Sequence, residues 1–333
     1  LFLRTAEFLW QEGHTAHATA EEARDETLQM LEVYRWFAEE FLAMPVITGP
    51  KTPRERFAGA VETFSIEAMM QDNKALQAGT SHDLGQNFAK AFDVKFANKS
   101  GTLDYVWATS WGVSTRLIGA LIMTHGDDDG IILPPKIAPT KVVIVPIFKS
   151  ELDQQSTIAH SEKIAEVLKK ELGALNVKID YRDNMKPGDK FFTWIQKGVP
   201  LRIEVGPKDV ANNGGMVVRR DTRDKQVCSM NEIATIVPQL LDDIQSNLFN
   251  RAKALLGENM MKVDTYDEFK KIFSEKGAFV LAHWDGTTET AGKIQAETKA
   301  SIRLIPNDGE LEAGKCIYSG KPSKQRVIFA LAY

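Results

Sequence analysis

Residues 105–139 read YVWATSWGVSTRLIGALIMTHGDDDGIILPPKIAP, and this stretch divides the chain in two. It starts with an apolar and aromatic run typical of a strand, and STRLIGALIMTH then has helical character. Prolines at positions 134, 135 and 139 disfavour a helix or a central strand at the end of the stretch. We therefore place a domain boundary at residue 139.

The part before this boundary predicts a helix and an antiparallel sheet. Thr19 and Glu22 have the spacing of a capping box, which marks a helix start. Apolar residues then recur every three or four positions, at Met30, Tyr34, Phe37 and Phe41. The helix should stop near Pro45. Short apolar runs separated by turns (VITG, FAGA, TFSIEAMM, YVWATSW) then indicate the strands of an antiparallel sheet.

The part after the boundary predicts an α/β domain over residues 140–248 and a small α+β domain over 249–333. KVVIVPIF is typical of a buried strand, and apolar residues between 164 and 175 mark one face of a helix. VKID, VPLRIEV and MVVRRD supply further strands, and a helix is expected from about 231 to 256. In the last domain TYDEFKKIF and FVLAHW predict a helix and a strand, followed by another helix and the strands SIRLIP and RVIFALAY.

Length and composition limit the classes of protein to which the chain can belong. A chain of 333 residues exceeds the size at which one core usually keeps growing, so two or three domains are expected. No run of about 18 apolar residues is present, which predicts no membrane partner. Two cysteines, Cys228 and Cys316, build neither a disulfide framework nor a zinc knuckle, and they suit the cytoplasm. The net charge of −4 does not exclude a nucleic-acid partner, because binding needs only a local basic stripe.

Several familiar sites are excluded by spacing. No G-x-x-x-x-G-K-[ST] loop occurs, and no G-x-G-x-x-G follows a strand. The adjacent aspartates of HGDDDG suit a solvated turn better than a calcium loop. The two histidines of HTAH have no third ligand nearby, so a metal site is not expected there.

Four segments combine aromatic rings, arginines and small residues: LRTAEFLWQEGH, RFAG, QAGTSHDLGQNF and SWGVSTR. A planar base fits between a ring such as Phe8 and a guanidinium such as Arg116, and Arg4 suits a polyphosphate. Each segment also has a plain structural interpretation. Phe8 and Trp10 can be core residues, and Arg4 can be a surface charge. Their joint presence favours a nucleotide site.

The same segments resemble a known family. LRTAEFLWQEGHTAH is similar to the second half of motif 2 of the class II aminoacyl-tRNA synthetases, and SWGVSTRLIGALIMTHGDDDGIILPP is similar to motif 3. FLWQEGH, QAGTSHDLGQNF, VPLRIEVGPKD and VVRRDT together resemble the prolyl-tRNA synthetases of the eukaryote-like and archaeal-like type. The resemblance implies a class II catalytic core up to residue 139, an anticodon-binding domain and a C-terminal domain. Motif 1, the first arginine of motif 2 and the amine-binding loop are expected upstream of residue 1, in a longer protein.

The resemblance implies ATP, Mg²⁺ and proline as ligands. In the ATP site the catalytic Arg4 would approach the phosphates, and the catalytic Arg116 would stack on the adenine ring with Phe8. Thr5 would meet the adenine edge, and Gln77 and Thr80 would line the ribose side. The proline pocket would comprise Trp10, Glu12, His14, Phe57, His82, Ser110 and Gly112. The substrate carboxylate attacks ATP directly in this chemistry, so the protein aligns two anions and needs no general acid or base.

The resemblance also implies tRNA(Pro) as a partner and a homodimeric enzyme. The anticodon would be bound by Phe191, Arg202, Lys208 and Asp209. Ile195 departs from the family pattern, since a glutamate is usual there. In many relatives the C-terminal domain binds zinc through four cysteines. This chain has Cys316 alone in that region, so no zinc is expected, and His283 is interpreted as a packed side chain.

Two alternatives remain at this point. One is another class II synthetase of the same subclass, for threonine or histidine. Trp10, His14 and Phe57 favour a small apolar ring over those substrates. The other is a non-catalytic tRNA-binding paralogue, which has no reason to keep Arg4, Phe8, Gln77 and Arg116 together.

Overall fold

A computed structural model describes residue 3 and residues 5–333 of the chain. The chain forms two compact units. The first unit contains Leu1–Glu39, Met44–Thr124 and Lys253–Tyr333, and the second contains Glu40–Ala43 and His125–Ala252. None of the described helices is both long and apolar enough to span a lipid bilayer.

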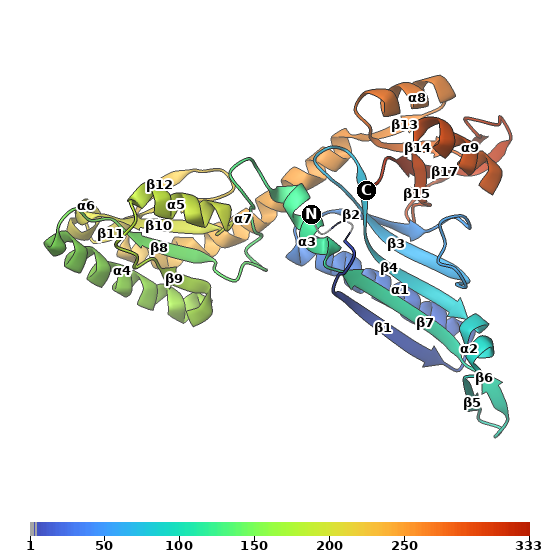
Figure 1. The fold of residues 1–333 in the computed structure, drawn as a ribbon, viewed down its shortest axis with the longest axis horizontal. Helices are drawn as coiled ribbons and strands as arrows, with labels where there is room; N and C mark the ends of the chain where they lie inside the picture. Colours follow the sequence, from blue (N-terminus) through green and yellow to red (C-terminus); the bar gives the residue numbers. More distant parts are fainter. Residues whose placement is uncertain (1–2, 4) are drawn as a thin grey trace. The chain divides into compact units, whose positions relative to one another are not determined.

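The first unit is built on an antiparallel five-stranded sheet in the order β1-β7-β4-β3-β2 (Figure 1). Its strands are β1 (Trp10–His17), β2 (Val46–Pro50), β3 (Glu62–Met69), β4 (Ala75–Gly85) and β7 (Trp107–Ser114). The short helix α2 (Asn87–Phe92) and a hairpin of β5 (Lys95–Ala97) and β6 (Leu103–Tyr105) lie between β4 and β7 in sequence. The helix α3 (Arg116–His125) follows β7 directly. The predicted antiparallel sheet and this helix are confirmed.

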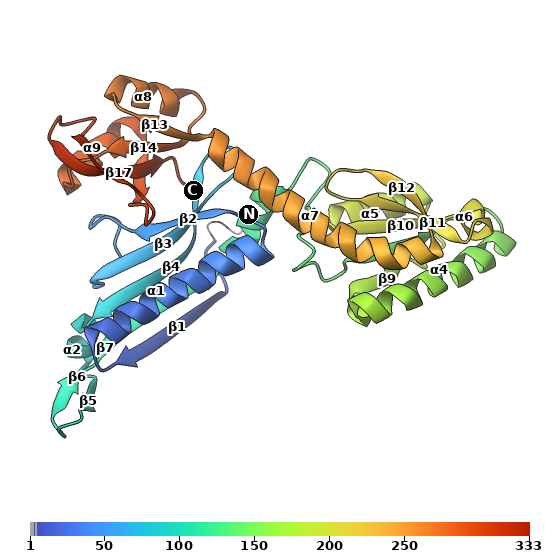
Figure 2. The ribbon, with the colours of Figure 1, turned by 180° about the vertical axis from the view of Figure 1, so that it is seen from behind.

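One face of this sheet is covered by α1 (Ala20–Trp36), as Figure 2 shows. Thr19 and Glu22 form the predicted capping box, with both of its hydrogen bonds present. A π-helical turn, Phe37–Phe41, extends α1 and ends before Pro45, as expected. Ser81 of β4 donates a hydrogen bond to the Thr27 carbonyl of α1 at 2.7 Å, which ties the buried helix face to the sheet.

One predicted strand of this region is wrong. FAGA, residues 57–60, lies in a turn-rich loop between β2 and β3. Its single aromatic residue, Phe57, is half exposed and lies against His82, with 4.8 Å between the ring centroids. A hydrophobic run of two or three residues resembles a short strand in sequence, but its side chains here are used to line a cavity instead of a core.

The C-terminal subdomain, residues 260–333, also belongs to the first unit. Its sheet has the order β13-β14-β17-β15, with β16 paired to β17. The strands are β13 (Met260–Val263), β14 (Phe279–His283), β15 (Ser301–Leu304), β16 (Leu311–Lys315) and β17 (Pro322–Ala330), and the helices are α8 (Tyr266–Glu275) and α9 (Thr288–Thr298). The amides of Ile305 and Asn307 donate to the carbonyls of Pro50 and Thr48 at 3.0 Å, so the subdomain is joined to β2.

The second unit has a mixed five-stranded sheet in the order β12-β11-β10-β8-β9. The strands are β8 (Val142–Pro146), β9 (Val177–Ile179), β10 (Leu201–Val205), β11 (Gly214–Arg219) and β12 (Lys225–Ser229). The helices are α4 (Glu151–Leu172), a 3-10 turn (Ala174–Asn176), α5 (Pro187–Gln196), α6 (Pro207–Ala211) and α7 (Met230–Glu258). β8 pairs in parallel with both β9 and β10, and the other pairs are antiparallel.

The two faces of this second sheet are covered by different helices. Alternate residues of β8 separate them: Val142 and Ile144 belong to the main core with α4 and α7, whereas Val143 and Val145 pack against α5. This two-sided burial explains why KVVIVPIF is continuously apolar. The sequence analysis did not predict the helices α2, α5 and α6 or the strands β1, β4, β5, β6, β12, β13 and β16. In α5 the sequence KFFTWIQ carries aromatic and β-branched residues that weaken the helical signal.

Candidate active site and anticodon face

Strand pairing aligns residues of β1, β7 and β4 in two rows that run across the sheet of the first unit. Antiparallel pairing sets β7 between β1 and β4. Residues paired directly across a sheet share one face. The first row is Glu12, Gly112 and Thr80, and the second row, two residues further along β1, is His14, Ser110 and His82. Six of the residues predicted for ATP or proline are thus neighbours on one face, although they come from three strands.

These rows border a cavity of about 410 Å³. Ten predicted site residues line it: Phe8, Trp10, Glu12, Phe57, Gln77, Thr80, His82, Ser110, Gly112 and Arg116. Gly112 has only a backbone oxygen within 4 Å of where its side chain would start, so the middle of the first row is open. Gly112 therefore leaves open space in the cavity between the carboxylate of Glu12 and the hydroxyl of Thr80.

Aromatic rings stand at the rim of this cavity. Phe8, Trp10 and Phe57 are each about half exposed, although large apolar side chains are usually buried. The rings of Phe8 and Trp10 lie 5.4 Å apart and are tilted by 49°. Exposed rings around a cavity are suited to a flat or ring-shaped ligand. The alternative that Phe8 and Trp10 are core residues is therefore wrong.

Glu12 is the carboxylate of the cavity. Trp10 Nε1 donates a hydrogen bond to its Oε2 at 3.0 Å, and His14 Nε2 lies 3.4 Å from its Oε1. The hydrogen bond from Trp10 lowers the pKa of Glu12, and the neighbouring His14 adds to this effect. Glu12 is therefore a fixed anion that can accept a hydrogen bond from an ammonium group.

His82 is the neutral member of the second row. Its burial lowers its pKa to about 4, so the ring is uncharged at neutral pH. Its Nδ1 lies 2.9 Å from Thr63 Oγ1, which fixes the ring beside Phe57. His82 and Phe57 together form a weakly polar wall.

Arg116 begins α3 at the edge of the cavity. Its Nη1 donates to the Gln77 carbonyl at 3.4 Å, and its backbone amide donates to Ser114 Oγ at 3.2 Å. The helix start places backbone N–H groups and a guanidinium on the same side, which favours a negatively charged ligand. Arg116 and Gln77 are thus held together, although 39 residues separate them.

Two predicted site residues are placed differently. Thr5 is exposed and does not line the cavity. His14 lines a neighbouring apolar cavity of about 450 Å³, which shares Glu12, Phe57 and Ser110 with the first. Arg4 lies outside the described residues. The sequence analysis did not assign Ala78, Gly79, Trp111, Val113 and Ser114, which also line the first cavity. All five lie in the segments QAGTSHDLGQNF and SWGVSTR.

No metal site is found among the described residues, where His, Cys, Asp and Glu never gather in groups of three or more with suitable geometry. His14 and His17 are three residues apart on β1, which directs them to opposite faces. His283 is buried, and its Nδ1 lies 3.1 Å from Ser323 Oγ. The Gly314 backbone approaches this ring so closely that a side chain at 314 would collide with it.

The second unit brings together two of the predicted anticodon residues. Arg202 of β10 lies over the ring of Phe191 of α5, and it donates hydrogen bonds from Nε and Nη2 to Glu204 at 3.1 and 2.8 Å. Lys208 is exposed on α6. Asp209 accepts a hydrogen bond from the Gly206 amide at 2.8 Å and so caps α6.

Ile195 borders a cavity of about 200 Å³ that is rich in cations. Arg202, Arg219, Arg220, Arg223 and Lys225 line it together with Trp194. Several of these cations are already paired, as Arg219 is with Asp221 at 2.7 Å. Positive side chains therefore gather here in a chain of net negative charge, and Arg223 and Lys225 are the exposed ones.

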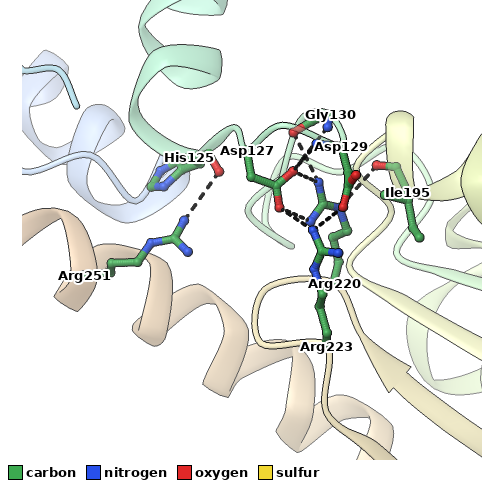
Figure 3. A network of polar contacts seen from close by, with 8 residues as sticks. All are labelled: His125, Asp127, Asp129, Gly130, Ile195, Arg220, Arg223 and Arg251. Atoms are coloured by element: carbon green, nitrogen blue, oxygen red, sulfur yellow. Dashed lines mark hydrogen bonds and ion pairs between the residues drawn. The ribbon is translucent and has the colours of Figure 1, made fainter. Parts of the chain in front are cut away.

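The HGDDDG turn is held by arginines of this cavity (Figure 3). Arg220 is buried and makes paired hydrogen bonds to Asp127 at 2.6 and 2.8 Å, and it also donates to the carbonyls of Gly130 and Ile195. Arg223 pairs with Asp127 and Asp129. The bond from Arg220 holds the pKa of Asp127 well below its usual range. The turn predicted in place of a calcium loop is therefore confirmed: Asp127 and Asp128 are exposed, and arginines pair with Asp127 and Asp129.

Three family models match the chain in succession. "tRNA synthetase class II core domain (G, H, P, S and T)" matches residues 2–125, "Anticodon binding domain" matches 141–240, and "Prolyl-tRNA synthetase, C-terminal" matches 266–333. The matched ranges cover the strands of the antiparallel sheet, the strands of the mixed sheet and most of the C-terminal subdomain.

Individual relatives agree with these matches. The chain is 57% identical to the proline–tRNA ligases of Porphyromonas gingivalis and of Christiangramia forsetii, over its whole length and 67% of theirs. It is 40% identical to a prolyl-tRNA synthetase from Cryptosporidium parvum crystallised with L-proline and AMP, with a TM-score of 0.94 over the whole chain and 69% of that protein. A structure from the same organism with halofuginone and AMPPNP gives 39% identity and the same TM-score. The chain therefore belongs to the prolyl-tRNA synthetase family, the class II ligases that join proline to tRNA.

Proposed function

We propose that the first unit activates proline with ATP in the cavity of about 410 Å³, and that the second unit selects tRNA(Pro) by its anticodon. The observation that carries the proposal is the pair of residue rows across β1, β7 and β4. The rows contain the ionised carboxylate of Glu12, the neutral ring of His82 and the open position at Gly112. Arg116, at the start of α3, lines the same cavity. Such a set binds a small zwitterion next to a polyphosphate.

The reaction has two steps. In the first step a carboxylate oxygen of proline attacks the α-phosphorus of ATP, prolyl-adenylate forms and pyrophosphate leaves. In the second step a ribose hydroxyl at the 3′ end of the tRNA attacks the carbonyl carbon, prolyl-tRNA forms and AMP leaves. Neither attack on these activated groups needs a dedicated acid or base, so alignment and charge neutralisation provide the catalysis.

The amino-acid part of the cavity recognises proline by charge and by shape. Glu12 supplies a fixed, ionised carboxylate beside the secondary ammonium group, in addition to the amine-binding loop expected upstream of residue 1. Trp10, Phe57 and the neutral His82 form walls around the five-membered ring. Ser110 and Gly112 form the floor, and His14 supports Glu12 from the neighbouring cavity.

The nucleotide part of the cavity recognises ATP. Phe8 and Arg116 stack on the two faces of adenine, and the guanidinium of Arg116 neutralises phosphate charge. Gln77 and Thr80 lie on the ribose side. Arg4 acts at the phosphates, and Thr5, which does not line the cavity, meets the adenine edge only if its segment moves toward the bound nucleotide. Mg²⁺ enters as part of the MgATP substrate, and no ligand for it is assigned among the described residues.

The second unit reads the anticodon with Phe191, Arg202, Lys208 and Asp209. Arg202 can make paired hydrogen bonds to guanine once it leaves Glu204. Two further properties complete the proposal. The enzyme works as a homodimer, and it works in the cytoplasm, where the free, buried thiols of Cys228 and Cys316 remain reduced.

Pyrophosphate exchange tests the proposal. The full-length protein, including the segments expected upstream of residue 1, should exchange pyrophosphate into ATP with proline and far less with threonine or histidine. Arg116→Ala should lower this rate by about 10²-fold, the usual effect of removing one charge-stabilising donor, while tRNA affinity stays nearly unchanged. Normal ATP kinetics in Arg116→Ala would refute the nucleotide site. Tight tRNA binding without any exchange would instead indicate a tRNA-binding paralogue.

A further inference from the structure

A buried ionic cluster joins the C-terminal subdomain to the active-site sheet. The side chain of Glu67, on β3, is fully buried, and Lys51 Nζ contacts its carboxylate at 2.8 Å. Arg303, on β15 of the subdomain, donates to both oxygens of Glu67 at 3.1–3.2 Å. Its Nη1 also donates to Ser301 Oγ at 3.1 Å. Burying three charged groups often stabilises a protein no more than apolar packing, so the cluster suggests a role in positioning.

Glu67 faces an irregular point of β4. Ile66 pairs with Gly79, but Glu67 pairs with Gln77, so Ala78 is an extra residue in β4. Such a β-bulge shifts the alternation of side chains by one position. Ala78 also lies on the wall of the nucleotide cavity.

The bulge decides the direction of Gln77. A side chain at Gly79 would point toward Tyr34 of α1, on the helix-covered face. With regular alternation Gln77 would point to that face too. The bulge turns it to the opposite face, which it shares with Thr80 and with its partner Glu67. Gln77 lines the nucleotide cavity there, and its carbonyl accepts the hydrogen bond from Arg116.

We propose that Arg303 is a positioning residue for ATP: by holding Glu67 it keeps the bulge at Ala78 in the arrangement that sets Gln77 and Arg116 on the nucleotide cavity. The C-terminal subdomain thereby contributes to activation without touching the substrate. This inference rests on the proposed nucleotide site. It predicts that weakening the contact of Arg303 with Glu67 changes the KM for ATP more than the KM for proline. Glu12 and Gly112 lie in β1 and β7, which are further from β3 than β4 is.

The chain offers a matched pair of variants for the test. Arg303→Lys keeps the charge but loses the paired geometry on Glu67. Arg326→Lys makes the same change in the same subdomain. The side chain of Arg326 is 11% exposed and that of Arg303 10%, and Arg326 pairs with Asp264 and Glu312, away from β3. Ser301→Ala is a milder variant that removes one support of Arg303. Pyrophosphate exchange at varied ATP and proline, thermal unfolding and amide exchange of residues 77–80 are measured for each.

In Arg303→Lys the KM for ATP should rise by about 3- to 10-fold, the range for residues that act through others. The KM for proline should change by less than about twofold. Amide exchange at residues 77–80 should become faster. Ser301→Ala should show smaller changes in the same direction, and it carries the test if Arg303→Lys does not fold. Arg326→Lys should alter thermal unfolding alone.

Two results would overturn the inference. One is equal ATP kinetics and amide exchange in Arg303→Lys and Arg326→Lys. The other is a loss of activity in Arg303→Lys that is spread equally over ATP and proline, as a general loss of stability would give. Arg116→Ala separates this failure from a failure of the proposed function. If Arg116→Ala impairs ATP use and Arg303→Lys does not, the nucleotide site stands and the positioning role is wrong.

Discussion

The guanidinium carbon of Arg202 lies 4.4 Å from the centroid of the Phe191 ring. A base stacked between the two groups would need roughly 7 Å, which is twice the contact distance of carbon atoms. The hydrogen-bonding edge of Arg202 is also occupied, because Nε and Nη2 both donate to Glu204. Anticodon recognition by these residues therefore requires Arg202 to exchange Glu204 for a base.

Arg202→Ala should weaken aminoacylation of tRNA(Pro) by about 1–3 kcal/mol, the value of one good paired contact to a base. Proline activation without tRNA should hardly change, because the variant lies in the second unit. Steady-state aminoacylation and pyrophosphate exchange measure the two effects. Lys170→Ala is the control, since it removes an exposed positive charge of the same unit. Equal effects of the two variants would mean that Arg202 contributes only its positive charge and no specific contact to a base.

Ile195→Glu restores the residue usual in the family and should be neutral or harmful here. The side chain borders a cavity with Arg202 and Arg223, so a new carboxylate would compete with the tRNA for Arg202, as Glu204 does. Gln196 is exposed and is the candidate that replaces the missing contact. Aminoacylation of wild-type and anticodon-mutant tRNA measures discrimination. Sharper discrimination in Ile195→Glu would show that the contact was lost without replacement.

Glu12→Gln should raise the KM for proline by about 10- to 100-fold, because a charge-assisted hydrogen bond becomes a neutral one. The amide oxygen can still accept the hydrogen bond from Trp10, so the local geometry is preserved. The KM for ATP should stay nearly constant. Pyrophosphate exchange at varied proline and ATP measures both constants. An unchanged KM for proline would remove Glu12 from the pocket.

Stability should fall as the pH decreases from about 6.5 to about 4, and His125 is one cause. Burial lowers the pKa of His125 to about 4, whereas the unfolded chain titrates near 6.5, so the unfolded state binds more protons between these values. His125→Gln can still donate to the Leu42 carbonyl. It should make the slope of unfolding free energy shallower by up to about 1.4 kcal/mol per pH unit.

Urea unfolding at a series of pH values across this range measures the slope. His82 shifts in the same direction, so part of the slope should remain in His125→Gln. An identical slope in the wild type and the variant would mean that the pKa of His125 is not lowered in the folded protein.

Local sequence patterns determined the elements whose signals lie within a few residues. The capping box at Thr19, the continuous apolar run of β8 and the helix after β7 were all predicted, because caps and side-chain periodicity depend on neighbours in the chain. The family was also recognisable from sequence, and ten of the residues expected at its ligand site line one cavity. The boundaries at 139 and 248 and the individual site roles stay predictions.

The tertiary structure decided how these residues meet. That Glu12 shares a row with Thr80 depends on the register of three strands, and that Gln77 faces the cavity depends on one extra residue in β4. The pairing of Arg202 with Glu204 and of Arg303 with Glu67 likewise left no local signal. Register, bulges and buried ion pairs are set by contacts between segments far apart in the chain, and a single sequence records the residue types but not which of them are brought together.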